Sequence, residues 1–122
     1  MVRAANELGV AVIVTEQYPK GLGHTVAELD LSGALCVPKT DFSMIVPDVS
    51  ARLSELQVSD AVIVGLEAHV CVQQTTLDLL AMDVNVHLCV DAISSQCAAP
   101  PRSIPRSLPT TSRRVTTVPA CM

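Results

Sequence analysis

Uninterrupted apolar runs alternate with amphipathic stretches along the first ninety residues of the chain. Two strand-like segments are Ala34–Val37 and Val84–Val90, and two further runs carry little or no polar alternation: Val10–Thr15 and Ala61–Val64. Runs of this kind are typical of strands buried on both faces, as in parallel sheets. Between them, Asp48–Leu56 and Val70–Met82 have apolar residues at helical spacing, which predicts two amphipathic helices. Asp48 stands where the first of these helices would have its N-cap.

The order of these elements predicts an α/β fold. Val2–Leu8 has the pattern of a short helix that ends at Gly9, and strands and helices then alternate to Val90. Crossovers between parallel strands are right-handed, so a mostly parallel sheet with helices on both faces is expected. Ligands of such folds bind beyond the carboxyl ends of the strands. The chemistry of this chain is therefore expected directly after each strand.

The chain changes character near Cys97. Five of the eight prolines lie from Pro100 onward, and residues 92–122 hold four arginines and no acidic residue. Prolines at this density forbid a long regular helix. We expect one α/β domain over residues 1–97 and a proline- and arginine-rich tail over 98–122, with one late strand at 113–118.

Composition narrows the possible partners and the compartment. The 122 residues carry a net charge of −4 and only two aromatic residues, Tyr18 and Phe42. This balance disfavours nucleic-acid and membrane-surface binding, and no apolar run approaches the length of a membrane span. The N-terminus lacks the layout of a signal peptide, and the five cysteines have no metal-ligand spacing. An odd number of cysteines, most of them in apolar runs, predicts free thiols in a reducing, cytoplasmic setting.

Cys71 is the main candidate for chemistry. It follows the strand Ala61–Val64 and opens a helix, where unpaired backbone N–H groups and the helix dipole stabilise a thiolate. Lys39 follows a neighbouring strand and would stabilise the thiolate further. The alternative is that Cys71 is a core thiol and Lys39 a solvated surface residue. Spacing alone does not separate these two interpretations.

Four motifs, in order, resemble one family. The segments Val14–Val26, Pro38–Met44, Gly65–Leu80 and Val90–Ser95 are similar to those of the eukaryotic isochorismatase domain-containing proteins. The resemblance covers roughly residues 2–97. It identifies the chain as a member of the isochorismatase-like hydrolases of the cysteine hydrolase superfamily, relatives of nicotinamidases. It implies a three-layer α/β/α, Rossmann-like fold with a mostly parallel sheet, expected to be incomplete because the family's first strand lies upstream of the matched residues.

The resemblance also implies roles for residues. Cys71 would be the nucleophile and Lys39 the catalytic lysine. A cis peptide at Leu66–Glu67 would aim the N–H groups of Glu67 and Cys71 at one oxyanion. The family's triad aspartate ends a strand upstream of the matched region, so no residue here takes that role. We expect no metal and no cofactor, because residues matching the nicotinamidase metal site are absent.

Two functions from different classes follow. The first is a cysteine hydrolase acting on a small polar substrate, impaired by the unassigned aspartate; Cys71 favours C–N or thioester-like hydrolysis over vinyl-ether cleavage. The second is a non-catalytic interaction or oligomerisation module. Glu16, Tyr18 and His69 are candidates for lining a substrate pocket. A sheet without its first strand would expose an edge, so a homo-oligomer is expected.

Overall fold

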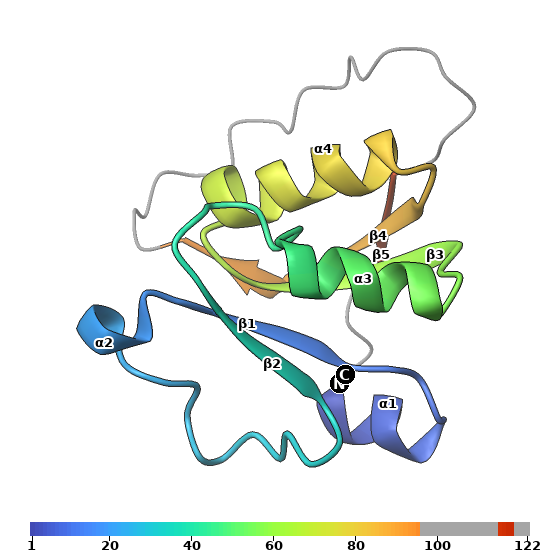
Figure 1. The fold of residues 1–122 in the computed structure, drawn as a ribbon. Helices are drawn as coiled ribbons and strands as arrows, with labels where there is room; N and C mark the ends of the chain where they lie inside the picture. The colour runs from blue at the N-terminus through green and yellow to red at the C-terminus, as the bar shows by residue number, and fades with distance from the viewer. Residues whose placement is uncertain (96–114, 119–122) are drawn as a thin grey trace.

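The computed structural model describes residues 1–95 and 115–118 (Figure 1). In chain order the elements are α1 (Val2–Glu7), β1 (Ile13–Gln17), α2 (Pro19–Leu22), β2 (Leu35–Lys39), α3 (Pro47–Glu55), β3 (Asp60–Leu66), the π-helical turn η1 (Ala68–Val72), α4 (Gln73–Ala81), β4 (Asn85–Ser94) and β5 (Val115–Val118). The α/β fold class predicted from the apolar runs is confirmed. β5 lies within the expected 113–118 segment, while the rest of the tail, with Cys97 and Cys121, lies outside the described residues.

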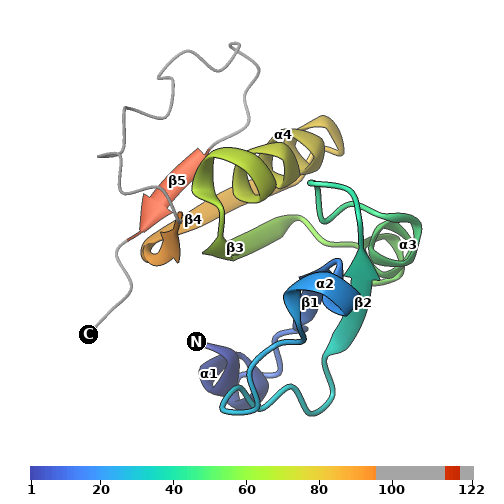
Figure 2. The same cartoon turned by 90° about the vertical axis from the view of Figure 1, so that its left-hand side faces the viewer.

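All the described strand pairs are parallel, but they form two separate sheets. β1 pairs with β2 in the first, and β3, β4 and β5 form the second in that order. Figure 2 shows the strands in one row, β5, β4, β3, β1, β2, so the unpaired edges of β1 and β3 are the inner edges of the row. Within residues 1–95 and 115–118, no ladder joins β1 to β3. The sheet is therefore divided between these two strands.

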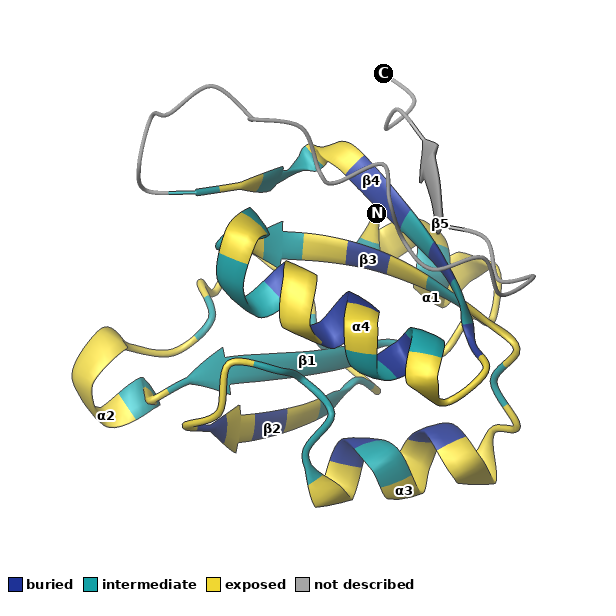
Figure 3. Ribbon diagram, turned by 90° about the horizontal axis from the view of Figure 1, so that it is seen from above, coloured by how far each residue is buried: buried dark blue, intermediate teal, exposed yellow. Residues whose placement is uncertain are grey.

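Helices lie on both sides of this row. α3 and α4 lie on one side and α1 on the other (Figure 2). The buried core lies between the strands and the α3–α4 layer, as the dark segments of α3, α4 and β4 indicate in Figure 3. Its members are Val37, Val49, Leu53, Ile63, Val72, Leu79, Val84, Val86 and Leu88. Because Val37 of β2 belongs to the same cluster as Ile63 of β3, the apolar core connects the β1–β2 sheet with the β3–β4–β5 sheet.

One face of β3 is exposed. Val62, Val64 and Leu66 are 56%, 39% and 73% exposed, whereas Ile63 between them is buried. The apolar run Ala61–Val64 predicts burial on both faces of this strand, and this prediction is wrong for β3. The physical reason is that α3 and α4 cover one face only, so alternate side chains of the strand point away from the core. None of the helices in the described ranges is long and apolar enough to span a membrane.

Two helix starts differ from the sequence expectation. Val46 is the N-cap residue of α3 and Pro47 occupies its first turn, so Asp48 lies one position inside the helix instead of capping it. Proline suits that first position because it has no N–H to leave unpaired. The predicted helix at Val70–Met82 begins earlier, as a π-helical turn, and becomes α-helical only at Gln73.

Candidate active site

Lys39 ends β2 and points inward. In the register of the parallel pair it stands opposite Gln17, the last residue of β1. Lys39 is 6% exposed, and its Nζ donates to Gln17 Oε1 at 2.5 Å, Asp41 O at 2.7 Å and Phe42 O at 3.1 Å. All three acceptors are neutral oxygens. The ammonium is therefore fully hydrogen-bonded but has no carboxylate ion-pair partner among the described residues.

Burial and neighbouring charges act in opposite directions on the pKa of Lys39. Burial lowers the pKa of Lys39, while negative charge at Cys71 and, to a smaller extent, at Asp41 acts to raise it. Burial lowers a lysine pKa because the charged form loses its hydration. Of the two groups that act to raise the pKa of Lys39, Cys71 has the larger effect.

Gln17 was not anticipated from sequence. Its Nε2 donates to Thr40 O at 2.8 Å, which orients its Oε1 toward Lys39. The available signal was the alternation of β1, because Ile13 and Gln17 fall on the same side of the strand and Ile13 packs against the core. The residues predicted from sequence to line the pocket were instead its neighbours, Glu16 and Tyr18.

Cys71 lies in η1, the π-helical turn that directly precedes α4, and is a partly buried free thiol. Single π-turns within helices are rare and recur at functional sites. The carbonyl of Cys71 accepts a hydrogen bond from Thr75 Oγ1 at 2.7 Å, and the same Thr75 oxygen accepts from the Met44 N–H at 2.9 Å. Thr75, which is 1% exposed, was also not anticipated from sequence.

The predicted cis peptide at Leu66–Glu67 is wrong, because the bond is trans. The chain turns from β3 into η1 through Glu67 itself, which has the left-handed conformation φ 65°, ψ 67°. A residue in this region reverses the chain direction without a cis bond, although it is strained for a side chain larger than glycine. The role of the Glu67 and Cys71 N–H groups as an oxyanion site stays a prediction.

Ser95 supports this turn from the end of β4. Its Oγ accepts a hydrogen bond from the Ala68 N–H at 3.0 Å and lies 3.2 Å from His69 Nδ1. The β3–β4 register shifts between Ile63 and Gly65, and this irregularity lengthens β4 so that Ser95 follows its end beside η1. His69 is exposed on this turn, and its Nδ1 also lies 4.0 Å from Glu67 Oε2.

Glu16 anchors the loop after β1. Its Oε1 accepts from the Thr25 N–H at 2.8 Å and its Oε2 from His24 Nδ1 at 2.7 Å. These two bonds, the backbone one first, lower the pKa of Glu16 to about 2. Both carboxylate oxygens of Glu16 are thus engaged by the loop.

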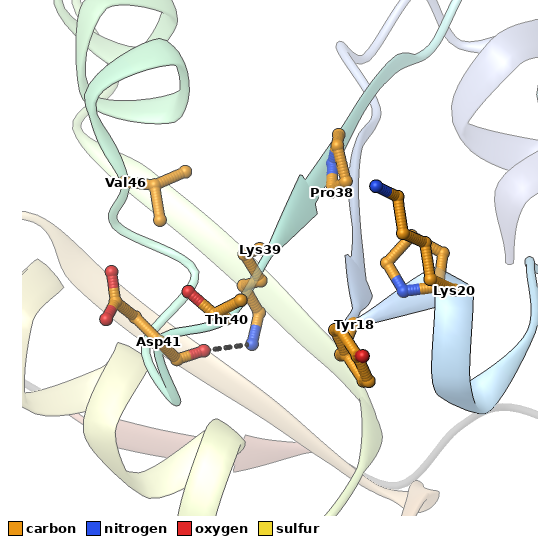
Figure 4. Close-up of a pocket in the computed structure, with 8 residues that line it drawn as sticks. Tyr18, Lys20, Pro38, Lys39, Thr40, Asp41 and Val46 are labelled. Carbon is orange, nitrogen blue, oxygen red and sulfur yellow. Dashed lines mark hydrogen bonds between the residues drawn. The ribbon is translucent and has the colours of Figure 1, made fainter.

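A shallow pocket of about 450 Å³ opens where β1 and β2 end (Figure 4). Its lining residues are Tyr18, Pro19, Lys20, Pro38, Lys39, Thr40, Asp41 and Val46. Of the sequence-predicted site residues, Tyr18 and Lys39 line this pocket, whereas Glu16, Leu66, Glu67, His69 and Cys71 do not. Within the described part of the chain, no group of three or more His, Cys, Asp or Glu side chains is placed to hold a metal ion.

Comparison with known proteins gives a consistent family pattern. The sequence profile described as "Isochorismatase domain" matches residues 1–102. The chain is 54% identical over 98 residues to isochorismatase domain-containing protein 1 of Salmo salar, covering 79% of this chain and 35% of that protein. It is 45% identical over 97 residues to isochorismatase domain-containing protein 2 of Rattus norvegicus, covering 46% of that protein. The chain thus spans between a third and a half of these relatives.

Solved structures give the same picture. The fold resembles a Caenorhabditis elegans structure titled MAR1 ribonuclease, with a TM-score of 0.73 and 48% identity, covering 80% of this chain and 51% of that one. It also resembles N-carbamoylsarcosine amidase of Thermoplasma acidophilum, with a TM-score of 0.63 over 75% of this chain and 64% of that one. At 17% identity the second likeness concerns the fold alone.

Proposed function

This chain belongs to the isochorismatase family, and on that premise we propose that it is a cysteine hydrolase of a small polar substrate, with Cys71 as nucleophile and Lys39 as its cationic partner. The observation that carries the proposal is the buried Lys39 ammonium, which is held by three neutral oxygens and whose pKa negative charge at Cys71 acts to raise. A cation beside a thiol favours the thiolate, which is the reactive form.

The proposed reaction proceeds through a covalent intermediate. The Cys71 thiolate attacks a carbonyl carbon, a C–S bond forms, and the C=O electron pair moves onto oxygen. When the C=O bond reforms, the C–N bond of an amide substrate breaks, and the amine leaves with a proton taken from a water molecule, which becomes hydroxide. A second water then attacks the thioester and loses a proton, which neutralises that hydroxide. The C–O bond forms, and the C–S bond breaks to return the thiolate. Helix-start N–H groups near Cys71 are suited to stabilise the oxyanion formed in each step.

We further propose that turnover by the chain as given is weak. In the family this chemistry uses an aspartate to move the proton, and the described residues offer no carboxylate that is hydrogen-bonded to Lys39. Asp41 is two residues beyond Lys39, but it contributes its backbone carbonyl to the ammonium. Loss of one member of a cooperating catalytic group costs orders of magnitude, so turnover at least about a thousandfold below that of a full-length relative is expected.

We do not propose ribonuclease activity for this chain, although the similar C. elegans structure is named a ribonuclease. Residues 1–91 hold all 12 acidic residues and only four basic ones. RNA binding depends on clustered positive charge, which this region lacks.

A reducing intracellular location is proposed on the ground that Cys36, Cys71 and Cys89 are all free thiols.

A second candidate function is an interaction module without catalysis. The unpaired inner edges of β1 and β3 and the exposed Val62 and Val64 favour it, because such edges and apolar faces recruit partners. Under this alternative, substitution of Cys71 would leave the biological role intact.

Selective alkylation separates the two candidates. Treatment of the intact chain with iodoacetamide at pH 6.5, followed by mass mapping, is expected to label Cys71 ahead of the other four cysteines. Cys36 is a suitable internal control, because desolvation and the nearby Glu16 carboxylate raise the pKa of its thiol. If Cys71 were the slowest to label, the nucleophile assignment would be wrong.

Turnover of a panel of small amides and vinyl ethers completes the test. Any activity is expected to disappear in Cys71→Ala and to persist in Cys89→Ala, which removes a buried thiol from β4. Cysteine-dependent turnover equal to that of a full-length relative would contradict the proposed impairment.

A further inference from the structure

The loop between β2 and α3, residues 40–46, contacts both halves of the candidate site. At its start, the carbonyls of Asp41 and Phe42 accept hydrogen bonds from Lys39 Nζ. Further along, the Met44 N–H donates to Thr75 Oγ1 on α4. One short loop therefore holds the lysine at one end and reaches the helix of the nucleophile at the other.

Thr75 completes the connection to Cys71. Its hydroxyl accepts from Met44 at 2.9 Å and donates to the Cys71 carbonyl at 2.7 Å, so a single oxygen joins the loop to the π-helical turn. The Thr75 residue is 1% exposed, and water has little access to replace either bond. A buried polar group that loses its hydrogen-bond partner still bears the cost of its lost hydration, so breaking either of these two bonds is unfavourable.

We propose that Thr75 is a positioning residue that sets the place of the Cys71 turn relative to Lys39, through the Met44–Thr75–Cys71 hydrogen-bond chain. This inference rests on the proposed function. The position requires a hydroxyl because only a group that accepts and donates at once can join the Met44 N–H to the Cys71 carbonyl. Threonine and serine meet this requirement, whereas valine and alanine do not.

The neighbouring Thr76 offers a matched control. It is also buried in α4, and its Oγ1 donates to the Val72 carbonyl at 2.8 Å, with the same four-residue spacing as Thr75 and Cys71. No hydrogen bond from the loop to Thr76 is found among the described residues. Thr75→Val and Thr76→Val therefore remove the same group from the same helix, but only the first breaks the connection to the loop.

The readout is the rate of Cys71 alkylation across a pH series. The titratable groups of the candidate site are Lys39 and Asp41 at the β2 end, where Asp41 acts on Lys39, and Glu67 and His69 on the turn that carries Cys71. If Thr75 holds Cys71 near Lys39, Thr75→Val slows Cys71 alkylation at pH 6.5 by about fivefold, the effect of one buried hydrogen bond, and moves the profile to higher pH. Thr75→Ser and Thr76→Val stay within about twofold of the unaltered chain.

A second background separates positioning from general loosening. In Lys39→Met, the added Thr75→Val change is expected to have no further effect on Cys71, because the cation through which it acts is gone. Thr75→Ala, which removes the hydroxyl with less steric demand, repeats the test if Thr75→Val does not fold.

Two results would overturn this inference alone: equal slowing by Thr75→Val and Thr76→Val, or slowing by Thr75→Val that persists in the Lys39→Met background. A Cys71 that labels slowest of the five cysteines in the unaltered chain would instead remove the proposed function on which the inference rests.

Discussion

Glu16 and Gln17 are adjacent in β1, and their side chains do different work on opposite faces of the strand. Gln17 is paired in register with Lys39 and hydrogen-bonds its ammonium, whereas Glu16 binds His24 and Thr25 of the following loop. The difference follows from strand geometry, in which successive side chains alternate. At this scale one residue of register decides whether a side chain supports the site or the loop beside it.

The Glu16 anchor predicts an acid-sensitive contribution to stability. The pKa of Glu16 is lowered from 4.5 to about 2 in the folded chain. A lowered folded pKa means that the stabilisation is present above pH 4.5 and is lost as the pH falls toward 2. Glu16→Gln should therefore lower the thermal unfolding midpoint at pH 7, and its difference from the unaltered chain should shrink between pH 4.5 and 2. The exposed loop residue Glu28, changed to Gln, serves as the control. An unchanged midpoint in Glu16→Gln at pH 7 would contradict the anchor.

At the scale of elements, α4 fixes the turn that carries Cys71, because the inner face of α4 is part of the core. Leu79 is 2% exposed and packs in the same cluster as Val72 of η1, while Leu77 is 41% exposed on the same helix. The helical spacing in the sequence predicted this inner face, and the strands were equally evident as apolar runs.

The two leucines make a matched pair for a stability measurement. Leu79→Ala is expected to lower the free energy of unfolding by about 2–5 kcal/mol, through lost burial and the cavity left behind. Leu77→Ala should change it by less than about 1 kcal/mol. Urea titration followed by circular dichroism gives both values, and comparable losses would mean that α4 does not pack as described.

The sequence was less informative about contacts between distant segments. Cys71 and Lys39 were predicted because each follows a recognisable strand. Gln17, Thr75 and Ser95 act through partners that are 22, 31 and 27 residues away, so their roles depend on strand register and loop path. The turn at Glu67 was expected to need a cis bond, because sequence does not distinguish that geometry from a left-handed residue.

At the scale of the whole molecule, the divided sheet governs how the chain meets other chains. Within residues 1–95 and 115–118, β1 and β3 each have one unpaired edge, and Val62 and Val64 are exposed on β3. Open edges and apolar faces pair readily with other chains.

Self-association is therefore expected at micromolar concentration. Sedimentation velocity should show dimers or larger species, and the double change Val62→Lys and Val64→Lys should shift the distribution toward monomer. Val26→Lys, a change at an exposed loop valine that is 59% accessible, is the control and should leave the distribution unchanged. A stable monomer of the unaltered chain at these concentrations would contradict the expectation.

The division of the sheet also bears on cooperativity. Among the described residues, the β1–β2 pair is joined to the rest by apolar packing of Ile13, Leu35 and Val37 and, through the loop after β2, by the hydrogen bond from Met44 to Thr75. No strand ladder crosses between them. Structure is lost in units whose internal bonds outnumber the bonds between them. We therefore expect β1 and β2 to open more readily as one unit than β3, α4 and β4, with the hydrogen bond from Met44 to Thr75 opposing this opening. Lys39 belongs to the first unit and Cys71 to the second, so each such opening would move Lys39 away from Cys71. The fraction of molecules in which the proposed site is assembled would then depend on this local opening equilibrium and not on global unfolding.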